Sequence, residues 1–328
     1  MILSNNKTDP NKLLPFQYTW TWQHYLKGMA NHWEPQRIPM QNDIETWKSD
    51  RLSDAERKTI LYNLGFFSTA ESLTANNLVL ALYGHITNPG ARAYLIKQAQ
   101  EEVLHSHMFI YCCESLGLDP DYIYNMYNTI PCIKEKDDFV INLTKTIFNK
   151  NFEVKTDDDV RLLLRDLIGF YIIMEGIFFY GGFAMMLALK RKNLMVGVGE
   201  QFNYTIRDEG VHLSFGNMVI ETIRAEYPKV WTKEFEKEVE VLVGEAVELE
   251  SKYIVECCPK SFAGVSRNSY VEYIKYIADK RLERLGMKKL YNVNNSLPWM
   301  SESIDLPRES NFFERNVQEY QSEGSLKW

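Results

Sequence analysis

The sequence predicts an all-α protein built as one large helical bundle. Apolar residues recur at spacings of three and four along almost the whole chain, and strict alternation is not sustained. Several of these segments can form helices of roughly 25–30 residues, which measure about 40 Å, the dimension of a large four-helix bundle. No internal repeat and no linker divides the 328 residues, so we expect a single bundle domain.

The expected helices follow from their start and stop signals. Ser53 and Glu56 form a capping box that opens the first long helix, and the turn at Asn88-Pro89-Gly90 separates it from the second. The acidic run 157–159 opens the third helix, where negative charge suits the helix dipole, and Pro228 stops the fourth. The predicted helices cover about 53–83, 90–117, 157–189, 197–226, 232–258 and 269–286.

Composition and charge exclude several classes of protein. A content of 45% hydrophobic and 25% charged residues, with only 17 Gly and 11 Pro, excludes collagen-like and wholly disordered chains. The net charge of −7, without an extended Lys/Arg cluster, argues against nucleic acid or an anionic membrane as a partner. The N-terminal residues lack a secretory signal, so we expect a cytoplasmic protein whose five cysteines are buried, reduced thiols without assigned chemistry.

The stretch 167–189 has a single charge, Glu175, in 23 apolar residues. It is long enough to span a bilayer, but it lacks a flanking belt of Trp or a basic cytoplasmic loop, and the chain has no second span of this quality. We therefore expect a helix buried on all sides by other helices, and keep a membrane-bound bundle as an alternative. A carboxylate inside such a helix is costly unless it is paired or bound to a metal ion.

Two Glu-x-x-His pairs suggest a metal site. Glu102 and His105 form the first and Glu209 and His212 the second. Residues at i and i+3 share a helix face, so a carboxylate and an imidazole can bind the same ion. Random placement also produces such spacings, so the pairs alone would equally fit two solvated helix faces.

Two further carboxylates strengthen the metal hypothesis. Glu71 and Glu175 lie in the apolar parts of the other two long helices. Four helices thus supply Glu, Glu-x-x-His, Glu and Glu-x-x-His, the ligand set of di-iron and di-manganese carboxylate bundles. Six such ligands suit Fe or Mn, whereas Zn is usually four-coordinate.

At these residues the sequence resembles the small (β) subunit of class I ribonucleotide reductase, closest to the subclass typified by the chlamydial proteins. The segments that carry the resemblance are GFFSTAES, EEVLHSHMFIY, IIMEGIFFY, RDEGVHLSFG, PWMSESIDL and VQEYQSEGSLKW, which span nearly the whole chain in family order. The resemblance implies a ferritin-like bundle with a dinuclear metal site. It also implies that Glu102 and Glu209 bridge the two ions, with Glu71, His105, Glu175 and His212 as the other ligands.

The chain departs from the common family pattern at two positions. Glu71 stands where the first ligand is usually Asp, and Phe109 stands where the family usually has its radical-bearing tyrosine. Phe has no phenolic O–H, so it cannot form a stable phenoxyl radical. The resemblance then implies a high-valent Mn/Fe cofactor as the store of oxidising equivalents, with Fe/Fe and Mn/Mn pairs as alternatives; Phe109 would also fit a packing role alone.

Family residues for radical transfer also find matches in this sequence. Trp33 takes the position of the relay tryptophan, and Asp208 would accept a hydrogen bond from the outer nitrogen of His105. Tyr320 matches the tyrosine that passes the radical between subunits, and the resemblance to the Phe-bearing subclass suggests a role for Tyr111 in activation. The alternatives are ordinary packing for Trp33 and Tyr111, and a plain tail residue for Tyr320. For Asp208 the alternative is support of His105 without a relay function.

The resemblance implies generation of a one-electron oxidant from O2 or a reduced oxygen species. A separate large (α) subunit would use it to reduce ribonucleotides to 2′-deoxyribonucleotides. We expect residues 1–295 to form the bundle, 296–328 to form a flexible tail that docks the large subunit through Leu326 and Trp328, and the chain to be a homodimer.

Three other functions share parts of this pattern. A Mn/Fe ligand-binding oxidase of the same bundle fold would lack the C-terminal Tyr-bearing tail and the pair Trp33 and Asp208. A ferritin-like storage or scaffolding protein would usually be half this length and would form cages. A membrane-bound bundle would need detergent.

Overall fold

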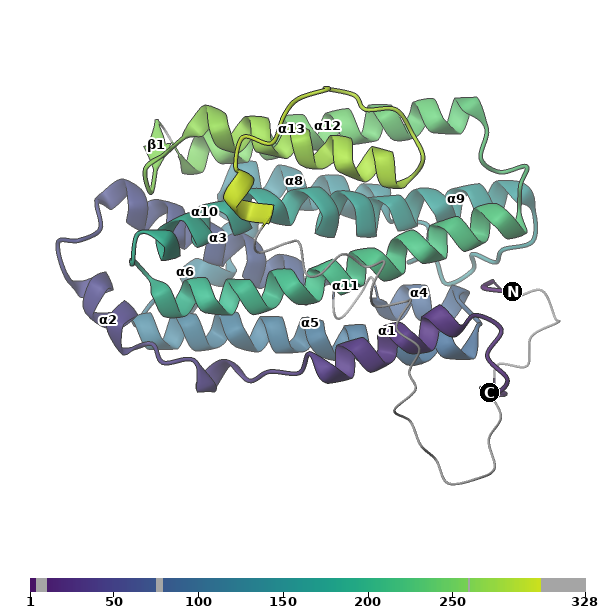
Figure 1. The fold of residues 1–328 in the computed structure, drawn as a ribbon, viewed down its shortest axis with the longest axis horizontal. Helices are drawn as coiled ribbons and strands as arrows, with labels where there is room; N and C mark the ends of the chain where they lie inside the picture. Colours follow the sequence, from purple (N-terminus) through teal and green to yellow (C-terminus); the bar gives the residue numbers. More distant parts are fainter. Residues whose placement is uncertain (4–10, 75–78, 259, 302–328) are drawn as a thin grey trace.

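The computed structural model describes residues 1–3, 11–74, 79–258 and 260–301, and within them the all-α prediction is confirmed. Long helices run side by side along the long axis of the molecule (Figure 1). Helices α12 (Lys233–Cys257) and α13 (Arg267–Arg284) lie along one long edge, and α1 (Thr19–Ala30) and α5 (Pro89–Leu116) lie along the opposite edge. A two-stranded hairpin, β1 (Ser261–Phe262) with β2 (Val265–Ser266), joins α12 to α13.

The remaining elements complete the bundle. They are η1 (Pro35–Arg37), α2 (Gln41–Lys48), α3 (Asp54–Leu73), α4 (Leu80–His85), α6 (Pro120–Tyr124), α7 (Met126–Thr129), α8 (Pro131–Leu143), α9 (Asp157–Leu167), η3 (Ile168–Phe178), α10 (Phe179–Arg191), α11 (Val196–Glu226) and η4 (Pro298–Met300). The predicted helix 53–83 contains α3, which ends at Leu73, and the start of α4 at Leu80; residues 75–78 between them lie outside the described residues. Helices α1, α2 and α8 were not predicted from the sequence.

The helices that matter for the interior have well-defined starts. Ser53 and Glu56 form the capping box of α3, and the Asn88 side chain accepts a hydrogen bond from the Ala91 amide at the start of α5. Helix α5 ends at Leu116 and is capped by Gly117, whose φ of 66° is a left-handed conformation that glycine adopts without strain. These helix termini set the positions of the buried side chains along α3 and α5.

Helix α11 is capped from a distant part of the chain. The buried carboxylate of Asp43, on α2, accepts hydrogen bonds from the amides of Gly197 at 2.8 Å and Val198 at 2.9 Å. A Cβ at position 197 would lie 2.7 Å from the Pro39 carbonyl oxygen, so glycine is required for this approach. The carboxylate satisfies two unpaired N–H groups at the positive end of the helix dipole and anchors α11 against α2.

The apolar segment 167–189 is the core of the bundle, as predicted. The helical span Asp157–Arg191 is apolar enough to cross a membrane by composition, but its most apolar window is entirely buried inside the protein. A helix enclosed on all sides by other helices needs no lipid, so this burial supports the prediction of a core helix over the membrane alternative.

A π-helical segment, η3, interrupts this core helix between α9 and α10. The wider π turn shifts the backbone carbonyls from their α-helical partners, and side chains from other helices bind two of them. Arg281 of α13 donates Nε–H to the Gly176 carbonyl at 2.9 Å, and Lys136 of α8 donates Nζ–H to the Phe178 carbonyl at 3.2 Å. Neighbouring helices thus hold the π segment in place.

Lys136 also forms a fully buried ion pair with Glu250 of α12. Their Nζ and Oε2 atoms are 2.6 Å apart, both side chains are inaccessible to solvent, and the ammonium lies 3.5 Å from the centre of the Phe66 ring. Burial raises the pKa of Glu250 to about 7, although the Lys136 charge and hydrogen bond oppose that rise. Removing one partner therefore leaves an uncompensated charge in an apolar environment.

We expect the Lys136→Met substitution to lower the free energy of unfolding by about 3–5 kcal/mol at pH 8, where Glu250 is ionised. The loss should be smaller at pH 5. Because the pKa of Glu250 is raised in the folded state, the folded state binds this proton more tightly than the unfolded state does. The resulting stabilisation is fully present below the unfolded pKa of about 4 and is lost as the pH rises through about 7. Urea unfolding of the apoprotein at both pH values measures this.

Two variants serve as controls for this prediction. Lys136→Met combined with Glu250→Met replaces both charges with apolar groups of similar volume and should recover most of the loss. Lys252→Met breaks the exposed ion pair with Glu135 and should change stability by less than about 1 kcal/mol. Equal effects of Lys136→Met and Lys252→Met would contradict the assignment.

Residues 296–301 pack onto the bundle. The Ser296 hydroxyl donates a hydrogen bond to the Ser269 carbonyl at 2.7 Å, and Leu297 and Met300 are buried. The packed part of the chain therefore continues at least to Met300, beyond the expected boundary at 295. The rest of the expected tail, 302–328, lies outside the described residues.

Candidate metal centre

The structure brings all six predicted ligands together in the core of the bundle. Each of the six side chains is at most 1% exposed. They come from four helical segments: Glu71 from α3, Glu102 and His105 from α5, Glu175 from η3, and Glu209 and His212 from α11. The i, i+3 spacing on α5 and α11 places one carboxylate and one imidazole of each helix on the same inner face.

Both imidazoles direct Nδ1 into the cluster. His105 Nδ1 is 3.2 Å from Glu71 Oε2, and His212 Nδ1 is 3.9 Å from Glu175 Oε1. The donor atoms form two groups, each able to hold one ion: Glu71, Glu102, His105 and Glu209 in the first, and Glu102, Glu175 and His212 in the second. We call these the His105 position and the His212 position.

Glu102 and Glu209 lie between the two positions. Glu102 places Oε2 at 3.6 Å from His105 Nδ1 and Oε1 at 3.0 Å from His212 Nδ1. Glu209 places Oε1 at 3.3 Å from His105 Nδ1 and Oε2 at 3.4 Å from His212 Nδ1. Each carboxylate therefore turns one oxygen toward each imidazole, which is the arrangement that a bridging ligand requires.

The cluster fits two divalent cations. Five buried carboxylate oxygens have no hydrogen-bond partner: Glu71 Oε1, Glu102 Oε2, Glu175 Oε2 and both oxygens of Glu209. Burying ionised carboxylates without partners is very costly, and burial accordingly raises the pKa of Glu71 and Glu175 well above the usual value. Two divalent ions would neutralise four carboxylates and supply the missing partners.

The Asp208 carboxylate connects His105 to Trp33. Asp208 Oδ2 accepts a hydrogen bond from Trp33 Nε1 at 2.8 Å and lies 3.4 Å from the outer nitrogen of His105. Burial raises the pKa of Asp208, but the hydrogen bond and charge of His105, with the Arg207 charge, outweigh burial and lower the pKa overall. The Trp33 ring stacks on Tyr204 at 5.1 Å.

Glu101 is a residue near the site that the sequence analysis missed. Its Oε2 atom lies 3.1 Å from the outer nitrogen of His212, as Asp208 lies beside the outer nitrogen of His105. The sequence contained a usable signal, because Glu101 and Asp208 each immediately precede a ligand glutamate. In the structure each of these two acids contacts the ligand histidine of the opposite helix.

Gln98 and Tyr171 were also missed. The Gln98 amide donates a hydrogen bond to Glu175 Oε1 at 3.0 Å, and the Tyr171 hydroxyl donates one to Gln98 Oε1 at 2.9 Å. Gln98 lies one turn before Glu102 on α5, and Tyr171 lies four residues before Glu175. Gln98 therefore orients Glu175 directly, and Tyr171 orients it through Gln98. Each lies four residues before a ligand in the sequence.

Phe109 is fully buried among other phenylalanines. Its ring stacks on Phe67 at 5.6 Å and packs edge-on against Phe202 at 5.7 Å. Tyr111, two residues later, is half-buried outside the ligand cluster, where its hydroxyl donates to the Ile38 carbonyl at 3.2 Å. Tyr320 lies outside the described residues.

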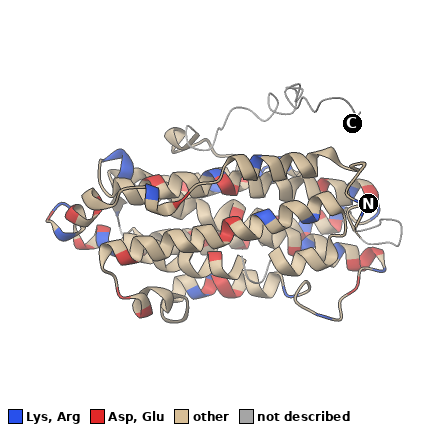
Figure 2. Ribbon diagram, turned by 90° about the horizontal axis from the view of Figure 1, so that it is seen from below, with Lys and Arg blue, Asp and Glu red and all other residues tan. Residues whose placement is uncertain are grey.

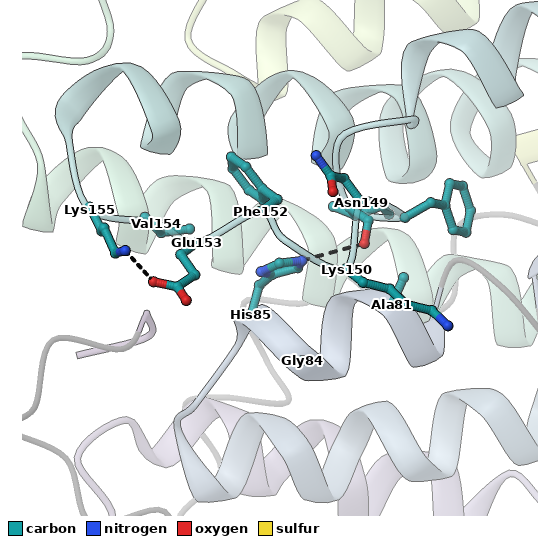
Figure 3. A pocket seen from close by; sticks show the side chains of 11 residues that line it. Ala81, Gly84, His85, Asn149, Lys150, Phe152, Glu153, Val154 and Lys155 are labelled. Atoms are coloured by element: carbon teal, nitrogen blue, oxygen red, sulfur yellow. Dashed lines mark hydrogen bonds and ion pairs between the residues drawn. The ribbon is translucent and has the colours of Figure 1, made fainter.

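A hollow of about 750 Å³ lies elsewhere, between α4 and the segment joining α8 to α9 (Figure 3). Its lining includes His85, which lies 3.4 Å from the Ile147 carbonyl oxygen, and the ion pair of Lys155 with Glu153. None of the six ligands lines it.

Four carboxylates and two imidazoles drawn from four helices define the dinuclear carboxylate class of helical-bundle metalloproteins. Residues 10–298 match the family model described as "Ribonucleotide reductase, small chain", and the chain belongs to this family. The chain is thus the small subunit of a ribonucleoside-diphosphate reductase, an enzyme that also needs a large subunit.

Known relatives agree over the full length of the chain. It is 50% identical to the ribonucleoside-diphosphate reductase subunit beta of Chlamydia pneumoniae, covering 100% of this chain and 94% of the relative. It is 32% identical to the ribonucleoside-diphosphate reductase small subunit of Dictyostelium discoideum, covering 98% and 89%. Among solved structures, the ribonucleotide reductase R2 subunit of Clostridium botulinum superimposes with a TM-score of 0.83 at 25% identity, covering 92% and 93%. The resemblance to the family is confirmed.

We expect the apoprotein to bind two divalent ions per chain, because there are two donor groups. Mn(II) at about 100 times its dissociation constant should stabilise the fold by about 3 kcal/mol per ion. Glu102→Ala removes a carboxylate shared by both positions and should weaken binding of both ions. Thermal unfolding with and without Mn(II), together with metal analysis, measures this. Glu114→Ala, an exposed change on the same helix, should behave as the wild type; an equal Mn(II) response in Glu102→Ala would refute the assignment.

Proposed function

We propose that this small subunit uses a Mn/Fe pair to make and store a one-electron oxidant, which the large subunit then uses to reduce ribonucleotides. A bound Mn/Fe pair would supply the reaction with O2 or a reduced oxygen species. The ligands are Glu71, Glu102, His105, Glu175, Glu209 and His212. Carboxylate and imidazole donors accept Mn and Fe alike, so the ligand set is compatible with this pair, with Fe/Fe and with Mn/Mn.

The observation that carries the proposal is the environment of Phe109. Phe109 stands at the position where the family usually has its radical-bearing tyrosine. The two rings that contact it, Phe67 and Phe202, also lack a phenolic hydroxyl. Phe67 contacts two more phenylalanines, Phe179 and Phe183. A tyrosyl radical at this position is chemically excluded, which favours storage of the oxidant on the metals.

The contacts of Trp33 support its role as the radical relay. Its indole N–H donates to Asp208 Oδ2, which also lies beside the outer nitrogen of His105. When Trp33 loses an electron, its indole proton becomes acidic, and Asp208 Oδ2 is placed to receive that proton. The same contact disfavours the Mn/Fe ligand-binding oxidase, which lacks this pair of residues.

Tyr111 and Tyr320 complete the proposed set of oxidisable residues. The Tyr111 hydroxyl binds the Ile38 carbonyl, in the segment that follows Trp33 and η1. This position near the relay, outside the ligand cluster, suits a role during activation. Tyr320 would pass the radical to the large subunit.

Loading the apoprotein with Mn(II) and Fe(II), exposing it to O2 and adding the large subunit should give full ribonucleotide reduction without a tyrosyl EPR signal. Trp33→Phe should retain the metals but lose reduction, because Phe cannot donate the hydrogen bond to Asp208 and is much harder to oxidise. Full activity with Fe alone, accompanied by a tyrosyl signal, would overturn the Mn/Fe proposal.

The tail is the proposed docking segment for the large subunit. Its last residues include the apolar Leu326 and Trp328, which follow a polar stretch that contains Tyr320. A polar segment with a few apolar anchors can order on binding and give reversible association.

Deleting the residues after Ser322 should abolish association with the large subunit, because both anchors are lost, while the metal content stays unchanged. Surface plasmon resonance against the large subunit, with metal analysis of the same sample, measures both quantities. Wild-type affinity in the truncated chain would contradict the docking role.

A homodimer is the proposed assembly, and the surface of α5 supports it. Ile96, Val103 and Ile110 recur every seventh residue on this helix and are 59%, 57% and 44% exposed. Leu26 and Met29 of the adjacent α1 are also exposed. Such an apolar stripe at one edge of the bundle suits a protein interface. A yeast protein of the same fold, Rnr4, with a TM-score of 0.75 at 23% identity, is described as a homodimer.

The charge distribution supports a cytoplasmic protein without nucleic-acid or membrane partners. In Figure 2 the positions of Lys and Arg are interspersed with those of Asp and Glu along the helices, without a continuous basic stretch among the described residues. Binding to nucleic acid would need such a concentration of positive charge.

A further inference from the structure

The two metal positions are supported in a reciprocal way. Asp208 of α11 faces the outer nitrogen of His105 on α5, and Glu101 of α5 faces the outer nitrogen of His212 on α11. A carboxylate that accepts the outer N–H of a ligating imidazole fixes its tautomer and makes the inner nitrogen a stronger donor. Each position therefore depends on an acid supplied by the opposite helix.

The neighbours of the two acids are different. Asp208 accepts a hydrogen bond from the neutral indole of Trp33, and the Arg207 guanidinium lies at its other oxygen. Glu101 instead pairs with the Lys97 ammonium, whose Nζ is 3.0 Å from Glu101 Oε1. The Lys97 and Glu101 side chains are only 5% and 3% exposed, whereas the Arg207 side chain is 22% exposed. Water therefore screens the Lys97–Glu101 pair less than it screens the Arg207–Asp208 pair.

Helix α1 covers the Lys97–Glu101 pair. A Cβ at Gly28 would lie 3.0 Å from Lys97 Cγ and 3.1 Å from Glu101 Oε1, so a glycine lets the α1 backbone pack directly on the pair. Lys97 also donates a hydrogen bond to Gln100 Oε1 at 2.8 Å, which fixes the ammonium. The Lys97–Glu101 pair is therefore a closely packed contact, shielded from water, on one side of the ligand cluster.

We propose that Glu101 is a positioning residue for His212, and that Lys97 reduces the donor strength of this histidine. A nearby ammonium draws charge from the Glu101 carboxylate, so that carboxylate polarises His212 less than it would without Lys97. The His212 position consequently depends on the Lys97–Glu101 pair and the His105 position on Asp208, which provides a basis for different donor strengths at the two positions. The inference rests on the proposed dinuclear site and deepens it.

Stepwise Mn(II) binding to the full-length apoprotein, measured by EPR, tests the proposal. Anomalous diffraction at the Mn edge then assigns each step to a position. Glu101→Gln should weaken binding at the His212 position by roughly 10–100-fold and leave the His105 position unchanged. Asp208→Asn should do the reverse, and Lys97→Met should strengthen binding at the His212 position. The exposed change Glu114→Gln should alter neither.

A double variant separates positioning from simple packing. Lys97→Met with Glu101→Gln leaves no unpaired buried charge, so its unfolding temperature should recover relative to Glu101→Gln while the defect at the His212 position remains. Recovery of metal binding in the double variant would overturn the positioning role. An equal loss at both positions in Glu101→Gln, or no strengthening in Lys97→Met, would also overturn the proposal.

The outcome for the wild type distinguishes this inference from the proposed function. If the wild-type chain binds two ions and the variants show no site selectivity, only the present inference fails. If the wild-type chain binds no pair of ions, the dinuclear function itself fails.

Discussion

The burial of four carboxylates in an apolar interior is the constraint on which the rest of this structure depends. Ionised groups without partners are costly in such an environment, and five of their oxygens lack any hydrogen bond. The fold must therefore bring all four to one place where two cations can neutralise them. Long helices with fixed starts do this, because a shift of one residue would rotate a ligand by about 100° away from the cluster.

The same constraint explains the supports around the core helix. Glu175 lies in a π segment, whose displaced carbonyls are bound by Arg281 and Lys136. Gln98 then binds the Glu175 carboxylate directly. The least regular part of the core thus receives hydrogen bonds from three other helices, and this holds a ligand where the backbone alone would allow movement.

The ligands could be predicted from the sequence because helical periodicity and residue type together determine them. Glu-x-x-His spacing needs only the geometry of one helix, and Glu71 and Glu175 stand out as charges in apolar segments. The π segment was not predicted, because it depends on packing between helices. Glu101 and the pair of Lys136 with Glu250 were missed for a related reason: their partners lie 111 and 114 residues away in sequence.

Phe109, at the position where the family resemblance places a radical tyrosine, is surrounded by residues that suit the proposed storage of the oxidant on the metals. A stored oxidant can be lost by oxidising any phenol or indole in contact with it, and the rings around Phe109 are phenylalanines, which resist oxidation. Beside His105, Asp208 accepts a hydrogen bond from the oxidisable Trp33. Unreactive rings around Phe109 and a hydrogen-bonded indole beside His105 are the arrangement that the proposed transfer through Trp33 requires.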